Sequence, residues 1–140
     1  MLWLDLVGAL ALGISGGSRF LAPIPALLAG LLVAAGGGVI RDVGFGLPLY
    51  IAQHPAYIVV ALAGGALGHR LASNPSRLIG FLDLAATLYF AYVGASRGLA
   101  YGLTAEAAAV AGVITALGGG AVLTVVTTVN FTLLGRSRHG

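Results

Sequence analysis

The chain has 140 residues, of which 59% are hydrophobic and only 8% are charged, with a net charge of +3 and a mean hydropathy of +1.01. Soluble domains carry about 25% charged residues, so this composition excludes a water-soluble globular protein and predicts an integral membrane protein. The absence of cysteine excludes disulfides and thiol chemistry. The arginines are scattered singly, a distribution that does not indicate a nucleic-acid partner.

Five apolar segments are candidate membrane-spanning helices, separated by prolines, glycine–polar pairs and charges. In chain order they cover residues 4–21, 24–47, 55–71, 78–99 and 104–134. No basic residue precedes the first segment, which also carries Asp5, so we interpret it as a span rather than a cleaved signal peptide. The fifth segment is long enough to bend or tilt.

The arginines predict the orientation, because positive charges favour the cytoplasmic side of a membrane. With five spans, five arginines fall on one side, whereas the opposite side receives only Arg97 together with Glu106. We therefore expect the N-terminus outside and the C-terminus in the cytoplasm. The five arginines are Arg19, Arg70, Arg77, Arg136 and Arg138.

The sequence contains an internal repeat. "LDLVGALALGISGGSRFL" (residues 4–21) aligns with "LDLAATLYFAYVGASRGL" (82–99), and "ALLAGLLVAAGGGVI" (26–40) aligns with "AAVAGVITALGGGAV" (108–122). Three spans separate the two starts, so the second copy enters the membrane upside down. We expect a first three-helix repeat over residues 1–72 and an inverted one over 78–140. Such repeats are typical of transport proteins with a site at the repeat interface.

Each repeat carries a glycine triplet in its second helix. Glycine weakens a helix by roughly 1 kcal/mol relative to alanine, so three in a row predict a kink or a break. Freed backbone carbonyls are tolerated only inside protein or beside a water-filled cavity. The alternative is that the glycines only allow close helix packing. The triplets are Gly36, Gly37 and Gly38, and Gly118, Gly119 and Gly120.

Arg41 and Asp42 lie in the apolar part of the second span. An ionisable group at membrane depth costs roughly 2.5–3.5 kcal/mol or more, so it usually faces the protein interior and serves a function. The alternative is a structural ion pair that locks the break. Sequence neighbours point about 100° apart on a helix, so separate partners are equally reasonable.

Three further residues are candidates for the same site. Asp5 and Asp83 open equivalent helices of the two repeats, although Asp83 is explained as well by favourable charge at a helix N-terminus. Thr124 stands where the repeat alignment places Asp42, which suggests a pore-lining role. Threonines in membrane helices also commonly bond their own backbone.

Enzymatic functions find no support. The pattern Gly36-x-Gly38-x-x-Arg41 lacks the third glycine of a dinucleotide fingerprint. His54 and His69 have no second ligand at a suitable spacing, so we expect no metal and no cofactor.

The stretches "LDLVGALALGISGG", "AAGGGVIRDVGFGLP" and "LDLAATLYFAYVGASRGL…GVITALGGG" resemble the prokaryotic TRIC family of trimeric intracellular cation channels. The resemblance implies a homotrimer in the inner membrane, surrounded by lipid. Each seven-span subunit would hold two inverted three-helix repeats, a seventh helix and its own pore. The pore would be pinched where the glycine-broken second and fifth helices meet. The implied activity is permeation of monovalent cations, chiefly potassium.

Two departures from the family pattern stand out. Leu123 and Thr124 occupy positions where many bacterial relatives have a second Arg-Asp pair. The 140 residues also contain no counterpart of the sixth and seventh helices, and with them the third helix of the second repeat is missing. Either the chain is truncated or it is a shorter natural form.

The leading hypothesis is thus a potassium-permeable channel, in which Asp42 attracts cations and Arg41 opposes them as a gate. The alternative is a secondary transporter of a small solute such as an amino acid, since inverted repeats fit it equally well. A third possibility is a structural membrane subunit without a pathway.

Overall fold

The computed structural model describes residues 2–72 and 77–139, with side chains over 3–72 and 77–129, and every element in this part is helical. Five long helices coincide with the five predicted segments to within a few residues, and a single helical turn separates two of them. The elements are α1 (Leu2–Gly17), α2 (Pro23–Phe45), α3 (Tyr50–Gln53), α4 (Pro55–Arg70), α5 (Arg77–Ala100) and α6 (Ala105–His139).

The ends of α2 follow from its sequence. Prolines occupy its first turn, where the missing N–H costs nothing. Gly46 ends the helix with φ of 69°, a left-handed conformation that glycine adopts without strain. The N–H of Leu47 then donates to the carbonyl of Asp42 at 2.8 Å, the reversal typical of a Schellman cap. This cap folds the connection to α3 back over the end of α2.

Three helices are long and apolar enough to cross a membrane by themselves: α2, α5 and the part of α6 over Ala105–Val129. Helices α1 and α4 have 16 residues each, fewer than the about 20 that a bilayer core requires. The number of spans therefore stays a prediction. Large apolar side chains face outward, as with Trp3 at 81% and Phe81 at 66% exposure, which is the pattern expected of a lipid-facing surface.

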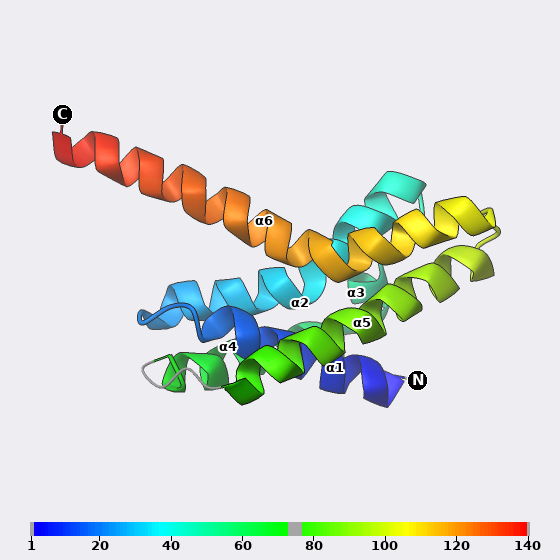
Figure 1. Ribbon diagram of the computed structural model, residues 1–140, viewed down its shortest axis with the longest axis horizontal. Coiled ribbons are helices and arrows are strands. Elements are labelled where there is room, and N and C mark those ends of the chain that lie inside the picture. Colours follow the sequence, from blue (N-terminus) through cyan, green and yellow to red (C-terminus); the bar gives the residue numbers. More distant parts are fainter. Residues whose placement is uncertain (1, 73–76, 140) are drawn as a thin grey trace.

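Helices α1, α2 and α4 pack on one another, and α5 packs on α6 (Figure 1). Helix α5 also contacts α1, and α6 contacts α2, which joins the two groups. The centre of the first group is made of small residues, because Ala9, Ala29 and Ala61 are at most 1% exposed. Small side chains let the backbones of membrane helices approach closely. The inverted repeat stays a prediction, and residues 73–76 at the join of its halves lie outside the described residues.

The glycine triplets do not break their helices, so of the expected kink or break the break is wrong. Helices α2 and α6 are each one continuous helix, although both change direction along their length (Figure 1). The two triplets lie against each other: a Cβ on Gly36 would be 3.1 Å from the Cα of Gly119, and one on Gly118 would be 2.8 Å from the Cα of Gly37. The helical hydrogen bonds are retained because an unpaired carbonyl in an apolar setting is costly. The glycines therefore serve close packing.

Candidate functional site

A buried ion pair lies on α2 beside its crossing with α6. Arg41 is 3% exposed and Asp42 is 1% exposed, and the Nε of Arg41 donates to the Oδ1 of Asp42 at 2.9 Å. The two Cβ atoms point in different directions on the helix, but the arginine side chain is long enough to fold back to its neighbour. The residues therefore form a mutual pair.

The carboxylate of Asp42 also binds two groups from elsewhere in the chain. Its Oδ2 accepts the backbone N–H of Tyr50 at 2.9 Å, which ties the start of α3 to α2. Its Oδ1 accepts from the Nε of Arg97 on α5 at 3.3 Å. One carboxylate is thus shared by two guanidinium groups, and it satisfies a backbone donor besides.

Arg41 connects this pair to α6. Its Nη1 donates to the Oγ1 of Thr115 at 3.1 Å, and the Thr115 hydroxyl donates to the carbonyl of Ala111 at 2.7 Å. The backbone of Thr115 lies directly against Gly37, where no Cβ would fit. The glycine contact therefore sets the distance across which Arg41 reaches α6.

A second polar cluster surrounds Asp5 on α1, which is 7% exposed. Its carboxylate accepts the hydroxyls of Tyr50 at 2.5 Å and of Tyr89 at 2.7 Å, and so joins α1, α3 and α5. Burial raises the pKa of Tyr50 above its ordinary value, and the Asp5 carboxylate adds to this effect. The Tyr50 hydroxyl consequently stays protonated and acts as a donor.

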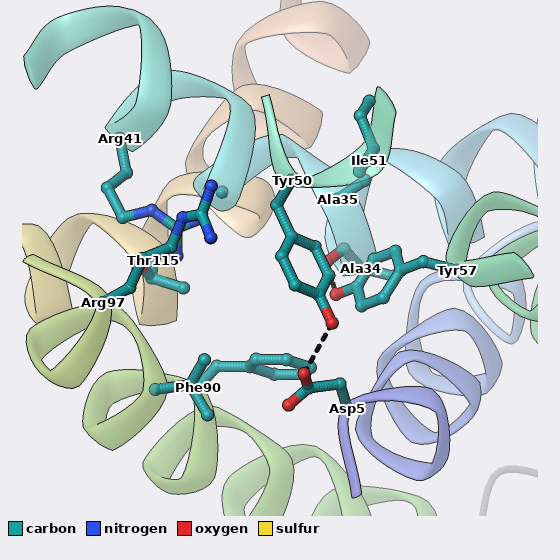
Figure 2. A pocket seen from close by; sticks show the side chains of 12 residues that line it. Asp5, Ala34, Ala35, Arg41, Tyr50, Ile51, Tyr57, Phe90, Arg97 and Thr115 are labelled. Carbon is teal, nitrogen blue, oxygen red and sulfur yellow. Dashed lines mark hydrogen bonds between the residues drawn. The ribbon is translucent and has the colours of Figure 1, made fainter. Parts of the chain in front are cut away.

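A cavity of about 30 Å³ lies between the two clusters. A site of this size holds a water molecule or two. In Figure 2, Arg41 and Arg97 approach it from one side and Asp5 lies opposite, with Tyr50 pointing between them toward Asp5. Within the described part of the chain, no buried polar side-chain atom lacks a hydrogen-bond partner. The polar lining residues are Asp5, Arg41, Tyr50, Tyr57, Arg97 and Thr115.

The structure brings together most residues that the sequence singled out. Arg41 and Gly38 line the cavity, Asp5 closes its other side, and Asp42 lies directly behind Arg41. The glycine crossing lies alongside, through Gly36, Gly37, Gly118 and Gly119.

Three predicted site residues lie elsewhere. Thr124 is exposed, donates to the carbonyl of Gly120, and lines an outer pocket with Arg19. Gly120 itself has open space around it. Asp83 has no side-chain partner among the described residues. It lies in the second turn of α5, which begins at Arg77, so the proposed role at the helix terminus is wrong.

Several side chains of the cavity and its clusters were not predicted from the sequence. The sequence assigned Arg97 only to the orientation and did not single out Thr115. One signal could have linked the tyrosines to Asp5: a buried tyrosine hydroxyl requires a hydrogen-bond partner, and a buried carboxylate requires a donor. The sequence alone did not connect them, since they lie on α1, α3 and α5.

These features define an all-helical integral membrane protein with a charged cluster and a water-sized cavity buried where its helices cross. A family model described as "Glycine transporter" matches residues 2–72. The UPF0126 inner membrane protein YadS of Escherichia coli K12 is 32% identical over 86% of this chain and 62% of its own length. The UPF0126 membrane protein of Deinococcus radiodurans is 35% identical over 86% of this chain and 60% of its own length.

A solved structure is also similar, that of the TRIC trimeric intracellular cation channel orthologue from Rhodobacter sphaeroides. It has a TM-score of 0.80 and 28% identity, over 89% of this chain and 69% of that one. The chain belongs to the family of the matching model and is a prokaryotic TRIC-type protein. It spans about 60% of the length of the curated relatives it matches.

Proposed function

We propose that the protein is a cation channel, selective for monovalent cations and chiefly permeable to potassium. The observation that carries this proposal is the buried Arg41–Asp42 pair beside a water-sized cavity at the α2–α6 crossing. Charged groups that line a narrow path between helices are the usual means of ion selection and gating. The likeness to the Rhodobacter channel supports the same reading.

In this proposal the described conformation is closed. The cavity admits water but not a continuous ion path, and the Arg41 guanidinium repels cations at its wall. Asp42 and Asp5 supply the negative charge that attracts cations. Conduction requires Arg41 to leave the wall while its charge stays paired with Asp42.

We extend the proposal to the assembly by likeness to the Rhodobacter channel, whose name describes it as trimeric. The protein would form a homotrimer in the inner membrane, with one pore in each subunit. The N-terminus would lie outside and the C-terminus in the cytoplasm. This orientation is inferred partly from Arg136 and Arg138, whose side chains lie outside the described residues.

A carrier for a small solute is not favoured. The cavity is water-sized, and the guanidinium groups of Arg41 and Arg97 at its wall both pair with Asp42, so neither is free to bind a carboxylate. The matching family is nevertheless described as a glycine transporter, so glycine uptake belongs in the test.

The deciding experiment records the purified protein in planar bilayers with potassium on one side and sodium on the other. Discrete current steps whose reversal potential shows a higher permeability to potassium than to sodium support the proposal. Asp42→Asn should then reduce the potassium current. Asp83→Asn is the matched control and should leave the current unchanged, because the Asp83 carboxylate has no partner among the described residues. A silent bilayer with saturable glycine uptake into proteoliposomes would establish the carrier instead. Silence in both assays would establish a subunit without a pathway.

A further inference from the structure

Arg97 makes more separate interactions than the ion pair with Asp42 requires. Its Nη2 donates to the carbonyl of Pro48 at 2.7 Å, in the connection between α2 and α3. Its guanidinium carbon lies 5.3 Å from the ring centre of Tyr50 and 5.0 Å from that of Tyr101. One side chain of α5 thus binds the end of α2, the following connection and the first residue of α3.

Apart from the Tyr101 ring, which follows α5, the groups that Arg97 contacts belong to the end of α2 and to the segment that covers one end of the cavity. Residues 47–49 and α3 fold back over Asp42, and Tyr50 reaches across the cavity to Asp5 (Figure 2). Apart from Arg97, the Tyr50 N–H bond to Asp42 and the Tyr50 hydroxyl bond to Asp5 hold this segment down. Arg97 is 14% exposed, more than Arg41 at 3%, so it is the guanidinium that water reaches more readily.

We infer that Arg97 is a positioning residue that latches the α2–α3 segment over the cavity, and that its release admits water and ions. The inference rests on the channel function proposed above. Asp42 does not depend on Arg97 for its charge balance, because Arg41 neutralises it at the shorter distance of 2.9 Å. Arg97 can therefore move without leaving the buried carboxylate unpaired, and it is the more exposed of the two partners. Both guanidinium groups line the cavity, and Arg97 in addition binds the segment that covers it.

The first test compares Arg97→Gln with Arg97→Lys in the 140-residue chain. Glutamine removes the charge and the stacking, and lysine keeps the charge but lacks the planar fork that reaches Asp42 and Pro48 together. Loss of charged hydrogen bonds of this kind shifts a closed–open equilibrium by roughly tenfold. We expect Arg97→Gln to raise the fraction of time open by about that factor, with Arg97→Lys intermediate. Arg70→Gln removes the same charge from the exposed end of α4 and should change nothing. An unchanged or lower open fraction in Arg97→Gln would overturn the latch.

A second test does not depend on current. The 140 residues contain no cysteine, so single cysteines introduced into them report access directly. Ala34→Cys places a thiol in the cavity wall at a residue that is 7% exposed, and Ala105→Cys places one at the exposed start of α6 as a reference. Adding Arg97→Gln should accelerate labelling of the first thiol by a charged, water-soluble reagent about tenfold and leave the second unchanged. Equal rates at Ala34→Cys with and without Arg97 would refute the latch. Faster labelling in a protein that passes no current would uphold the latch and refute the channel.

Discussion

Arg41 of α2 and Thr115 of α6 are joined by a 3.1 Å hydrogen bond between Nη1 and Oγ1, next to the point where Gly37 rests on the Thr115 backbone. The polar contact and the glycine contact thus involve the same residue of α6. The position of the buried guanidinium depends on how closely the two helices approach. A change in the packing at the crossing should therefore also move the charge at the cavity.

The first prediction concerns this hydrogen bond. Thr115→Val keeps the shape of the side chain but removes the acceptor for Arg41, so a buried charged donor is left unsatisfied. Loss of such a partner costs about 1–3 kcal/mol, which should lower the midpoint of thermal unfolding in detergent. Thr124→Val removes an exposed hydroxyl that bonds only its own helix and is the matched control. Equal midpoints for the two variants would contradict the role given to Thr115.

The glycine crossing gives the second prediction. Gly37→Ala places a Cβ against the carbonyl oxygens of Ile114 and Thr115, which are backbone atoms that do not move aside easily. Overpacking of this kind costs about 1–3 kcal/mol, so the variant should unfold at a lower temperature. Gly120→Ala meets open space and gains roughly 1 kcal/mol of helix propensity, so it should be neutral or stabilising. A comparison of the two melting curves separates packing from propensity. Two neutral substitutions would mean that α2 and α6 do not touch there.

The third prediction concerns the buried carboxylate of Asp42. Asp42→Asn leaves Arg41 as a buried cation without its counter-ion, and breaking a buried pair in this way costs about 3–5 kcal/mol. The variant should show a large loss of thermal stability in addition to its effect on current. Arg97 lies near Asp42 but is less buried, so Arg97→Gln should be much less destabilising. A reversed order of stability would show that Arg97, not Arg41, is the main partner of Asp42.

The fourth prediction tests the cluster around Asp5. Tyr50→Phe and Tyr89→Phe each remove one hydroxyl donor, at a cost of about 1 kcal/mol each. Because both hydroxyls bind the same carboxylate, the double variant should be less stable than the sum of the single effects predicts. Tyr92→Phe, at a tyrosine that is 61% exposed, is the control. Strict additivity in a double-mutant cycle would indicate that the two tyrosines act independently.

The sequence predicted the helices well because their limits are local signals. Proline at the start of α2 and α4, and the charges between apolar segments, act within a turn or two of the residues concerned. The effect of the glycine triplets was harder to predict, because the same residues are consistent with a broken helix and with a close helix crossing. The outcome depended on Thr115 and Val33 of the opposing helices, which no local pattern specifies.

The site could be predicted only in part for a similar reason. Asp5, Arg41 and Asp42 stood out because charge in an apolar run is costly wherever the chain goes. Arg97 lies at the end of a helix, where an arginine usually faces solvent, and Tyr50 lies in a connection. Their contribution arises from the Gly46 cap, which folds the α2–α3 connection back onto Asp42. Thr124 lies away from the cavity because a repeat alignment gives sequence register and not the face of the helix that packs.

The closest contacts at the crossing of α2 and α6 are between glycine backbones, with the side chains of Ile40 and Val122 beside them. Helices usually resist sliding because side chains on one fit between those on the other. Gly36, Gly37, Gly118 and Gly119 supply no side chains for such interlocking, so we expect the contact to act as a pivot. A small rotation about it would be magnified toward the far ends of α2 and α6. The rigidity that the crossing lacks is supplied by the polar bonds from Arg41 and Asp42, which makes the angle between these helices responsive to charge.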